Sequence, residues 1–322
     1  MLHSKSALAA LLLGLSALAL PAQAQDWPKR QITITVVTAA GGSPDTVGRL
    51  IASKLTERLG KPVVVENNTA GAGVTGTLNV VRGPADGHNL VVLTGGAPSQ
   101  ELLRPDQPYK LLKDLSMVTT LCAYPLVVAV APSSPVQNFA DLLALAKKQP
   151  GGVKFNMNAV GSLHHLLGEW IGIEGKVDVQ SIAYRGAPPA FMDVTNGRLD
   201  AMIDTTTFIM PQVEQKQLRP LAISSPGPYA LAPGVPTIKE TLPAIEMMSW
   251  LGLAMAKDTP PAIVEKINTE VRAILELDDV KQKLAQMGNL PLPSSPQEMS
   301  VRIERELAQW KRVIDIKGIK AE

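Results

Sequence analysis

The stretch ITITVVTAAGGSPDTVGRLIASKLTERLG, residues 32–60, decides the fold class of this chain. Residues 32–37 are apolar or β-branched and predict a buried strand. Ser43 and Pro44 predict the start of a helix, with serine as N-cap and proline at the first helical position. Apolar residues then recur at helical spacing until Gly60, where we expect the helix to end. A strand joined at once to a helix predicts an α/β fold.

The same alternation continues along the chain. Strands are expected at 63–65 and 90–93, with a helix over 74–81 between them. This β-α-β-α-β order predicts a mostly parallel sheet with right-handed crossovers. Further strands and helices predict a second α/β lobe. Its strands are expected at 153–155, 179–183, 201–203 and 218–223, and its helices at 138–147, 162–173, near Pro188 and near Phe208.

The C-terminal part of the sequence returns to helix after a proline-rich segment. Residues 226–243 are typical of a surface loop. Thr259 and Pro260 begin one amphipathic pattern, and the capping box Ser295-Pro296-Gln297-Glu298 begins another. The pattern alone does not decide whether these last helices pack on the first lobe.

The N-terminal residues 1–24 have the features of a secretory signal peptide. Lys5 supplies the positive charge, residues 7–20 are apolar, and Ala22-Gln23-Ala24 forms a cleavage site. The apolar run is too short to span a bilayer, although an N-terminal membrane anchor is the alternative. We therefore expect a mature chain that begins at Gln25 in the periplasm.

Composition excludes several classes of function. The net charge is only +2 and aromatic residues make up 4% of the chain, so no nucleic-acid partner is expected. Cys122 is the only cysteine and lies in an apolar run, which favours a buried small hydrophobe over a reactive thiol. His165 and Glu169 make at most an incomplete two-ligand site. We expect neither a metal nor a cofactor.

The loop between the first strand and its helix is the first candidate binding site. Ligands bind at such strand ends in open α/β sheets, and the unpaired N–H groups of a helix start attract anions. An ordinary, well-capped turn is an equally good interpretation of this loop by itself. The candidate residues in it are Ala39, Ala40, Gly41, Gly42, Ser43 and Asp45.

Two further loops offer free backbone groups. One is the third strand's end, and the other precedes the helix that Ser162 opens. Arg185 could add charge, or could be a simple exposed arginine. The candidate residues of these two loops are Thr94, Gly95, Gly96 and Ala97, and Gly161 and Ser162.

Two enzyme motifs are matched only in part. Ser43 lies in Gly41-Gly42-Ser43-Pro44-Asp45, which lacks the final glycine of the G-x-S-x-G nucleophile elbow. A secreted serine hydrolase using Ser43 therefore stays as an alternative function. Residues 71–76 match G-x-G-x-x-G, but no acid follows at the end of the next strand, so a glycine-rich turn is the better interpretation.

The motifs taken together resemble the Bug (TctC) family of extracytoplasmic solute receptors, the binding components of tripartite tricarboxylate transporters. The resemblance extends from about Trp27 to Gly318. It is carried by AAGGSPDTVGRLIASKLTERLGKPVVVENNTAGAGVTG (39–76), PADGHNLVVLT (84–94), GSLHHLLGEW (161–170), AYRGAPPAFMDVTNGRLDAMIDT (183–205), LRPLAISSP (218–226), PGVPTIKET (233–241) and SWLGLAMAKDTPPAIVEKIN (249–268).

The resemblance implies a type II periplasmic-binding-protein fold of two α/β lobes joined by a double-crossover hinge. Residues 25–125 and 247–322 would form lobe 1, and residues 126–246 lobe 2. It also implies that backbone N–H groups, hydroxyls and waters hold the ligand's carboxylates. To the loops named above it adds Asn158, Val160, His165, Asp204 and Thr205 as binding residues.

The sequence departs from the family pattern in places that bear on the ligand. The usual run close to A-G-N-G-S is here Asn158-Ala159-Val160-Gly161-Ser162, and His88 replaces a usual tyrosine. The family's Asn-Pro is absent around Gln100 and Glu101. A more apolar or longer acid would suit these changes.

The expected function is therefore capture of a small carboxylate (a dicarboxylate, tricarboxylate or aromatic acid) by closure of two lobes. The closed monomer would deliver it to membrane permease subunits of a tripartite transporter, and no enzymatic activity is expected. The alternative of a ligand-binding component of a sensory system shares the same lobes, so the sequence does not separate the two.

Overall fold

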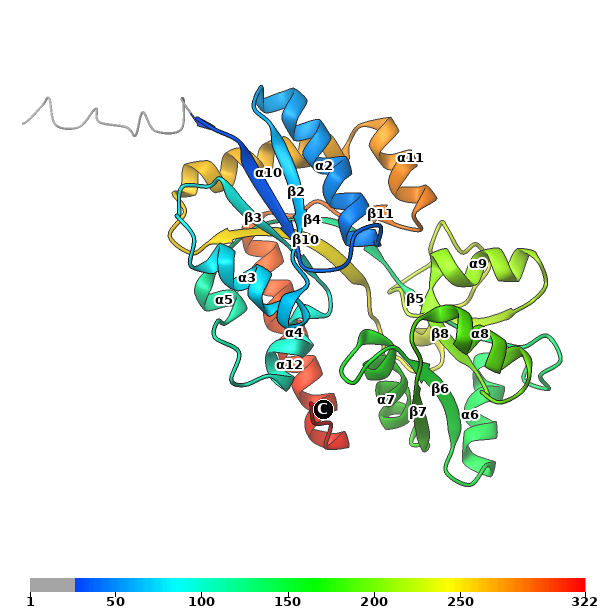
Figure 1. The fold of residues 1–322 in the computed structure, drawn as a ribbon. Coiled ribbons are helices and arrows are strands. Elements are labelled where there is room, and N and C mark those ends of the chain that lie inside the picture. Colours follow the sequence, from blue (N-terminus) through cyan, green and yellow to red (C-terminus); the bar gives the residue numbers. More distant parts are fainter. Residues whose placement is uncertain (1–26, 322) are drawn as a thin grey trace, which may run out of the picture.

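The computed structural model describes residues 27–321 of the chain. The predicted signal peptide lies outside this part. Within it, no helix combines the length and the apolarity that crossing a bilayer requires. Figure 1 shows two α/β lobes side by side, with the described chain starting in the larger one.

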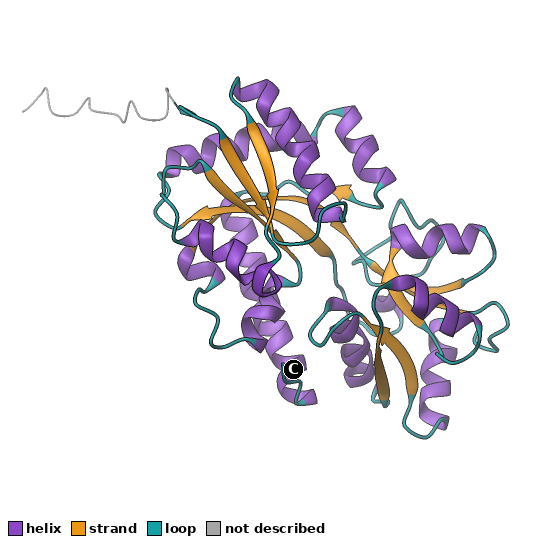
Figure 2. Ribbon diagram, viewed as in Figure 1, coloured by secondary structure: helices purple, strands orange, loops and turns teal. Residues whose placement is uncertain are grey.

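The larger lobe is built on a six-stranded sheet in the order β11-β4-β10-β3-β1-β2 (Figure 2). β1 pairs in parallel with β2 and β3, but β10 pairs antiparallel with both β3 and β4, and β11 with β4. The expected mostly parallel sheet is therefore wrong, because a strand from the C-terminal part enters in the opposite direction. The strands are β1 (Ile32–Val36), β2 (Val63–Asn67), β3 (Asn89–Thr94), β4 (Leu115–Tyr124), β10 (Ser249–Ala256) and β11 (Leu290–Pro291).

Helices cover both faces of this sheet, so its central strands are apolar on both sides. In β3, Leu90 and Val92 face one core, whereas Val91 and Leu93 face the other. The first core also holds side chains of α2 (Ser43–Leu59), α10 (Pro261–Leu275) and α11 (Asp278–Gln286). The second is closed by α3 (Val74–Val81), α5 (Leu111–Asp114) and the start of α12 (Pro296–Lys317), with α4 (Ala97–Leu103) beside them.

The smaller lobe holds two short sheets, β8-β5-β9 and β6-β7. The buried Asn156 joins them, since its amide side chain exchanges hydrogen bonds with both the N–H and the C=O of Ile203. The strands are β5 (Leu126–Val130), β6 (Val153–Met157), β7 (Val179–Ala183), β8 (Met202–Thr205) and β9 (Arg219–Ile223). The helices are α6 (Phe139–Lys148), α7 (Leu163–Gly175), α8 (Ala187–Thr195) and α9 (Thr206–Glu214).

Two chain segments cross between the lobes. The first leads from β4 directly into β5, and the second returns into β10. Ser224 ties them together, because its Oγ accepts from the N–H of Leu126 and donates to the C=O of Met247. This pair of crossings is the double-crossover hinge that the family resemblance implied.

Helix α12 contacts both lobes. Met299 and Ile303 near its start lie in the core of the larger lobe, whereas Trp310 and Val313 lie in the core of the smaller one. Its predicted capping box is confirmed, since Ser295 and Glu298 bond reciprocally. Two ion pairs join its end to α7: Lys317 with Glu169 at 3.0 Å, and Arg312 with Glu174 at 2.8 Å.

Two local expectations are wrong. The N-cap of α2 is Gly42 rather than Ser43, which is already the first helical residue. The proline-rich segment 226–243 is not a plain surface loop, because it includes a short 3-10 helix, η4 (Ile238–Glu240), and buries Tyr229 and Ile238.

The expected burial of Cys122 is confirmed, and burial raises the pKa of its thiol to about 12.

Candidate functional site

Asp45 organises the loop between β1 and α2. Its Oδ2 accepts from the N–H of Gly41 at 2.9 Å, and its Oδ1 accepts from Nδ2 of Asn67 at 2.9 Å. Arg49, one helical turn on, pairs with the same carboxylate at 2.9 Å. The hydrogen bond from Arg49 lowers the pKa of Asp45 to about 2, although burial opposes the shift. Asp45 is 3% exposed and supports the loop from beneath.

The first free backbone N–H of this loop is that of Gly42. Within the described residues, the amides of Gly42, Ser43 and Asp45 have no hydrogen-bond partner. Gly42 and Ser43 are exposed. These amides belong to the start of α2, where the helix dipole also favours negative charge. The loop therefore presents free backbone donors of a kind that can bind an anion, and Asp45 supports it.

The loop after β3 offers fewer donors than expected. The N–H of Gly95 is taken by the C=O of Trp250 at 2.8 Å. The amides of Gly96 and Ala97 are without partners in the described part of the chain. Thr94 is partly buried at the end of the strand. Ser99, which the sequence did not single out, donates its Oγ hydrogen to the C=O of Gly161 at 2.9 Å and so joins the two lobes.

The loop between β6 and α7 uses two of its backbone donors internally. The N–H of Gly161 donates to Nδ1 of His165 at 3.0 Å, and the N–H of Ser162 donates to the C=O of Ala159. Ser162 is the N-cap of α7, as predicted, and accepts from the N–H of His165. Burial lowers the pKa of His165. Since His165 holds the loop, its side chain is a support rather than an exposed donor.

The strand end at Asp204 lies against this loop. Oδ1 of Asp204 accepts from the N–H of Thr205 at 2.7 Å, and its Oδ2 lies 3.8 Å from Nε2 of His164. Nδ1 of His164 in turn lies 3.4 Å from Nδ2 of Asn158. Asn158 and Asp204 thus both lie close to His164, a residue that the sequence did not place in the binding site. Val160 is half-buried, whereas Arg185 is exposed and has no ion pair among the described residues.

A cavity of about 400 Å³ lies where the two lobes meet at the start of α2. Three residues that the sequence predicted line this cavity: Gly41 and Ser43 from the larger lobe and Thr205 from the smaller one. No charged side chain lines it within the described part of the chain. The sequence missed the rest of its lining because these residues come from segments with no motif of their own. They are Thr46, Tyr124, Thr207, Gln286, Met287 and Asn289.

The enzyme motifs have structural explanations. Ser43 is the first residue of α2 and forms no hydrogen bond with a histidine among the described residues. In the glycine-rich turn, a Cβ on Gly73 would lie 2.9 Å from Cβ of Val37, and one on Gly76 would lie 2.9 Å from the C=O of Asn68. These glycines allow α3 to approach β1 and β2 closely.

Comparison with known proteins gives a family match. The model of the "Tripartite tricarboxylate transporter family receptor" matches residues 47–319. Protein BugT of Bordetella pertussis is 32% identical over 306 residues, which is 94% of each chain.

Two solved structures from Rhodopseudomonas palustris are similar over nearly the whole chain. One, solved with adipate, is 32% identical and covers 92% of this chain and 100% of its own, with a TM-score of 0.78. The other, MatC with bound malate, is 26% identical and covers 89% and 100%, with a TM-score of 0.74. These likenesses confirm the predicted type II periplasmic-binding-protein fold.

Proposed function

The chain belongs to the tripartite tricarboxylate transporter family of receptors, and from this we propose that it captures a small carboxylate in the cavity between its two lobes. The family and the fold are those of solute-binding receptors, which act outside the cytoplasm. The proposal places this chain in the periplasm after removal of residues 1–24.

The observation that carries the proposal is the group of free amides at the start of α2. Ser43 lines a cavity that both lobes form, and Gly42 and Asp45, whose amides are also free in the described residues, lie beside it in the same loop. A helix start of this kind stabilises an anion without a cationic side chain. This fits a cavity whose lining lacks arginine and lysine in the described residues.

We propose a C4–C6 dicarboxylate as the leading ligand, with a tricarboxylate or an aromatic acid as alternatives. Two relatives contain adipate and malate, which are both dicarboxylates. A cavity of about 400 Å³ lies in the range of small-molecule sites. The amides at α2 would hold one carboxylate, and the second would face the opposite wall of the cavity, where Thr205 and Thr207 of the other lobe lie.

Ligand capture would proceed by hinge closure. We propose that residues 25–125 and 247–322 form one lobe and residues 126–246 the other, and that the lobes move about the two crossings that Ser224 ties while the end of α12 stays packed on the smaller lobe. A ligand held by donors from both lobes favours the closed form. The closed form would then dock on permease subunits in the membrane.

A thermal-shift screen of the mature chain tests the proposal directly. Adipate, malate, citrate, benzoate, glucose and putrescine form a set that varies charge and shape. We expect at least one carboxylate to raise the melting temperature in a concentration-dependent way, because it binds only the folded state. A rise with the sugar or the amine, and with none of the acids, would reject the proposal. Calorimetry on the best acid then gives its stoichiometry.

A further inference from the structure

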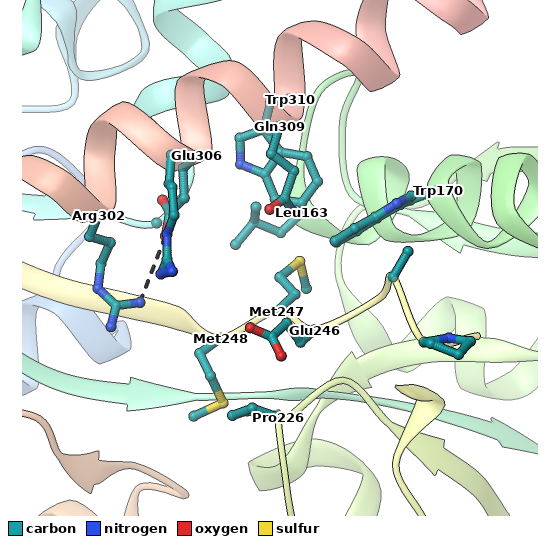
Figure 3. Close-up of a pocket in the computed structure, with 14 residues that line it drawn as sticks. Leu163, Trp170, Pro226, Glu246, Met247, Met248, Arg302, Glu306, Gln309 and Trp310 are labelled. Atoms are coloured by element: carbon teal, nitrogen blue, oxygen red, sulfur yellow. Dashed lines mark ion pairs between the residues drawn. The ribbon is translucent and has the colours of Figure 1, made fainter. Parts of the chain in front are cut away.

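A second cavity, of about 370 Å³, lies between α12 and α7 (Figure 3). It shares no lining residue with the cavity at the start of α2. Its walls come from both lobes, since Arg302 and Trp310 belong to α12 and Leu163 and Trp170 to α7. Gly95, at the end of β3, reaches its edge. The function proposed above makes no use of this space.

Much of the cavity wall suits a flat, apolar group. The rings of Trp170 and Trp310 stand nearly perpendicular, with centroids 5.7 Å apart. In Figure 3 the thioether of Met247 lies beside Leu163, near both indole rings. Aromatic rings pack favourably against indole edges and against methionine sulfur. An aromatic body is therefore the best match for this part of the wall.

Trp310 has an unused hydrogen-bond donor in this wall. Its side chain is 1% exposed, and within the described residues its Nε1 has no hydrogen-bond partner. In Figure 3 the indole nitrogen lies on the side of the ring that faces Glu306. A buried N–H without an acceptor is costly, so an oxygen atom of an occupant would stabilise this position.

The charges around the cavity favour an anion. Arg302 and Arg305 project from the same helix, and both line the cavity. Glu306 accepts from Nε1 of Trp250 through both oxygens at 2.9 Å and also lies 3.9 Å from a guanidinium nitrogen of Arg302, and burial raises its pKa to about 7. Glu246 is paired with Lys239 at 2.6 Å. Arg302 is therefore paired with Glu306, whereas Arg305 has no ion pair among the described residues and is the cation that remains for an anionic occupant.

We propose that this cavity is a second binding site, which takes a small aromatic carboxylate with its ring between Trp170 and Met247 and its carboxylate toward Trp310 and the arginines. The proposal does not depend on the ligand of the first cavity. Because both lobes form the walls, an occupant would also bias the hinge.

Benzoate is the probe for the test, and the readout is the set of indole N–H signals of the four tryptophans in a ¹⁵N-labelled chain. Trp310→Phe identifies the Trp310 signal. We expect benzoate to shift that signal until it saturates. By calorimetry, Trp310→Phe and the double change Arg302→Gln with Arg305→Gln should each weaken benzoate binding about tenfold, which corresponds to about 1.4 kcal/mol. Arg312→Gln, on the same helix but paired with Glu174, is the matched control and should keep the affinity.

A further variant separates the two cavities. Gly42→Pro removes a donor of the first cavity and should leave the benzoate titration of Trp310 unchanged. An unmoved Trp310 signal, or a shift that disappears in Gly42→Pro, would overturn the second site. If Trp310→Phe does not fold, the arginine changes carry the test, since both side chains are on the surface of α12. A failure of adipate and malate to bind would count against the first cavity's function alone.

Discussion

The N–H of Gly41 donates to Oδ2 of Asp45 across 2.9 Å. This bond uses a donor that the loop would otherwise offer to a ligand, and it fixes the loop relative to the first turn of α2. Asp45 also accepts from Arg49 and Asn67, so one buried carboxylate joins the loop, the helix and β2. The amides that remain free, at Gly42 and Ser43, are thereby held in place.

Asp45 should make the stability of the protein depend on pH at the acid end. Its pKa is about 2 in the folded chain against 3.8 for the ordinary side chain, so its contribution is present above pH 4 and is lost as the pH falls toward 2. Because the Arg49 side chain is 51% exposed and screened by water, we expect roughly 1 kcal/mol. Urea unfolding from pH 2 to 5 should show this slope in the wild type and a smaller one in Asp45→Asn. Equal slopes would contradict the role of the carboxylate.

The amide of Gly42 should contribute directly to ligand binding. Gly42 has a φ of −75°, which proline can adopt, so Gly42→Pro removes the N–H with little backbone strain. We expect affinity for the acid found in the thermal screen to fall about ten- to a hundredfold, the value of one charge-assisted hydrogen bond. Gly42→Ala is the matched control, since it keeps the N–H and its Cβ would have only ordinary contacts. Calorimetry that finds the two variants equal would remove this amide from the site.

Glu306 should have the opposite pH effect. Burial raises its pKa to about 7 in the folded chain, whereas the unfolded chain ionises near 4.5. Its contribution is therefore present below pH 4.5 and is lost as the pH rises through 7, by roughly 3 kcal/mol at most. Glu306→Gln keeps an acceptor for Trp250 and cannot ionise. Unfolding free energies measured from pH 4 to 8 should decline more in the wild type than in this variant, and parallel curves would show that the glutamate is ionised throughout.

Gly161 should not tolerate a side chain. It has a φ of +74°, and a Cβ there would lie 2.0 Å from Cδ1 of Leu103 in the other lobe. We expect Gly161→Ala to cost roughly 2–4 kcal/mol, from the backbone conformation together with overpacking. Gly60→Ala has a similar φ of +66° and open space, so it measures the backbone part alone, roughly 1–2 kcal/mol.

A second change tests the contact itself. Adding Leu103→Ala to Gly161→Ala should recover part of the lost stability relative to the sum of the single changes, because the clashing methyl group is removed. Chemical denaturation of the wild type, the two single variants and the double variant gives the four unfolding free energies of this double-mutant cycle. Strict additivity would show that the lobes do not meet at this point in solution.

The sequence by itself determined the local elements. The first strand, the helix end at Gly60 and the caps at Ser162 and Ser295 occur where they were predicted, and the first helix begins within one residue of the predicted start. Each depends on hydrogen bonds and on apolar spacing within a few residues, which the sequence shows directly. The family resemblance added the two lobes and the hinge, and the loops that meet between them.

Only the tertiary structure decided the order of the strands and the chemistry of the pocket. β10 lies between β3 and β4 because the chain returns from the smaller lobe in the opposite direction, and no local pattern encodes that return. Tyr124, Gln286 and Asn289 meet Ser43 only after folding. The donors of Gly41 and Gly161 are used by side chains four residues further on, and the donor of Gly95 is used by the distant C=O of Trp250. Which amides stay free depends on three-dimensional packing, because hydrogen-bond partners are chosen by distance in space.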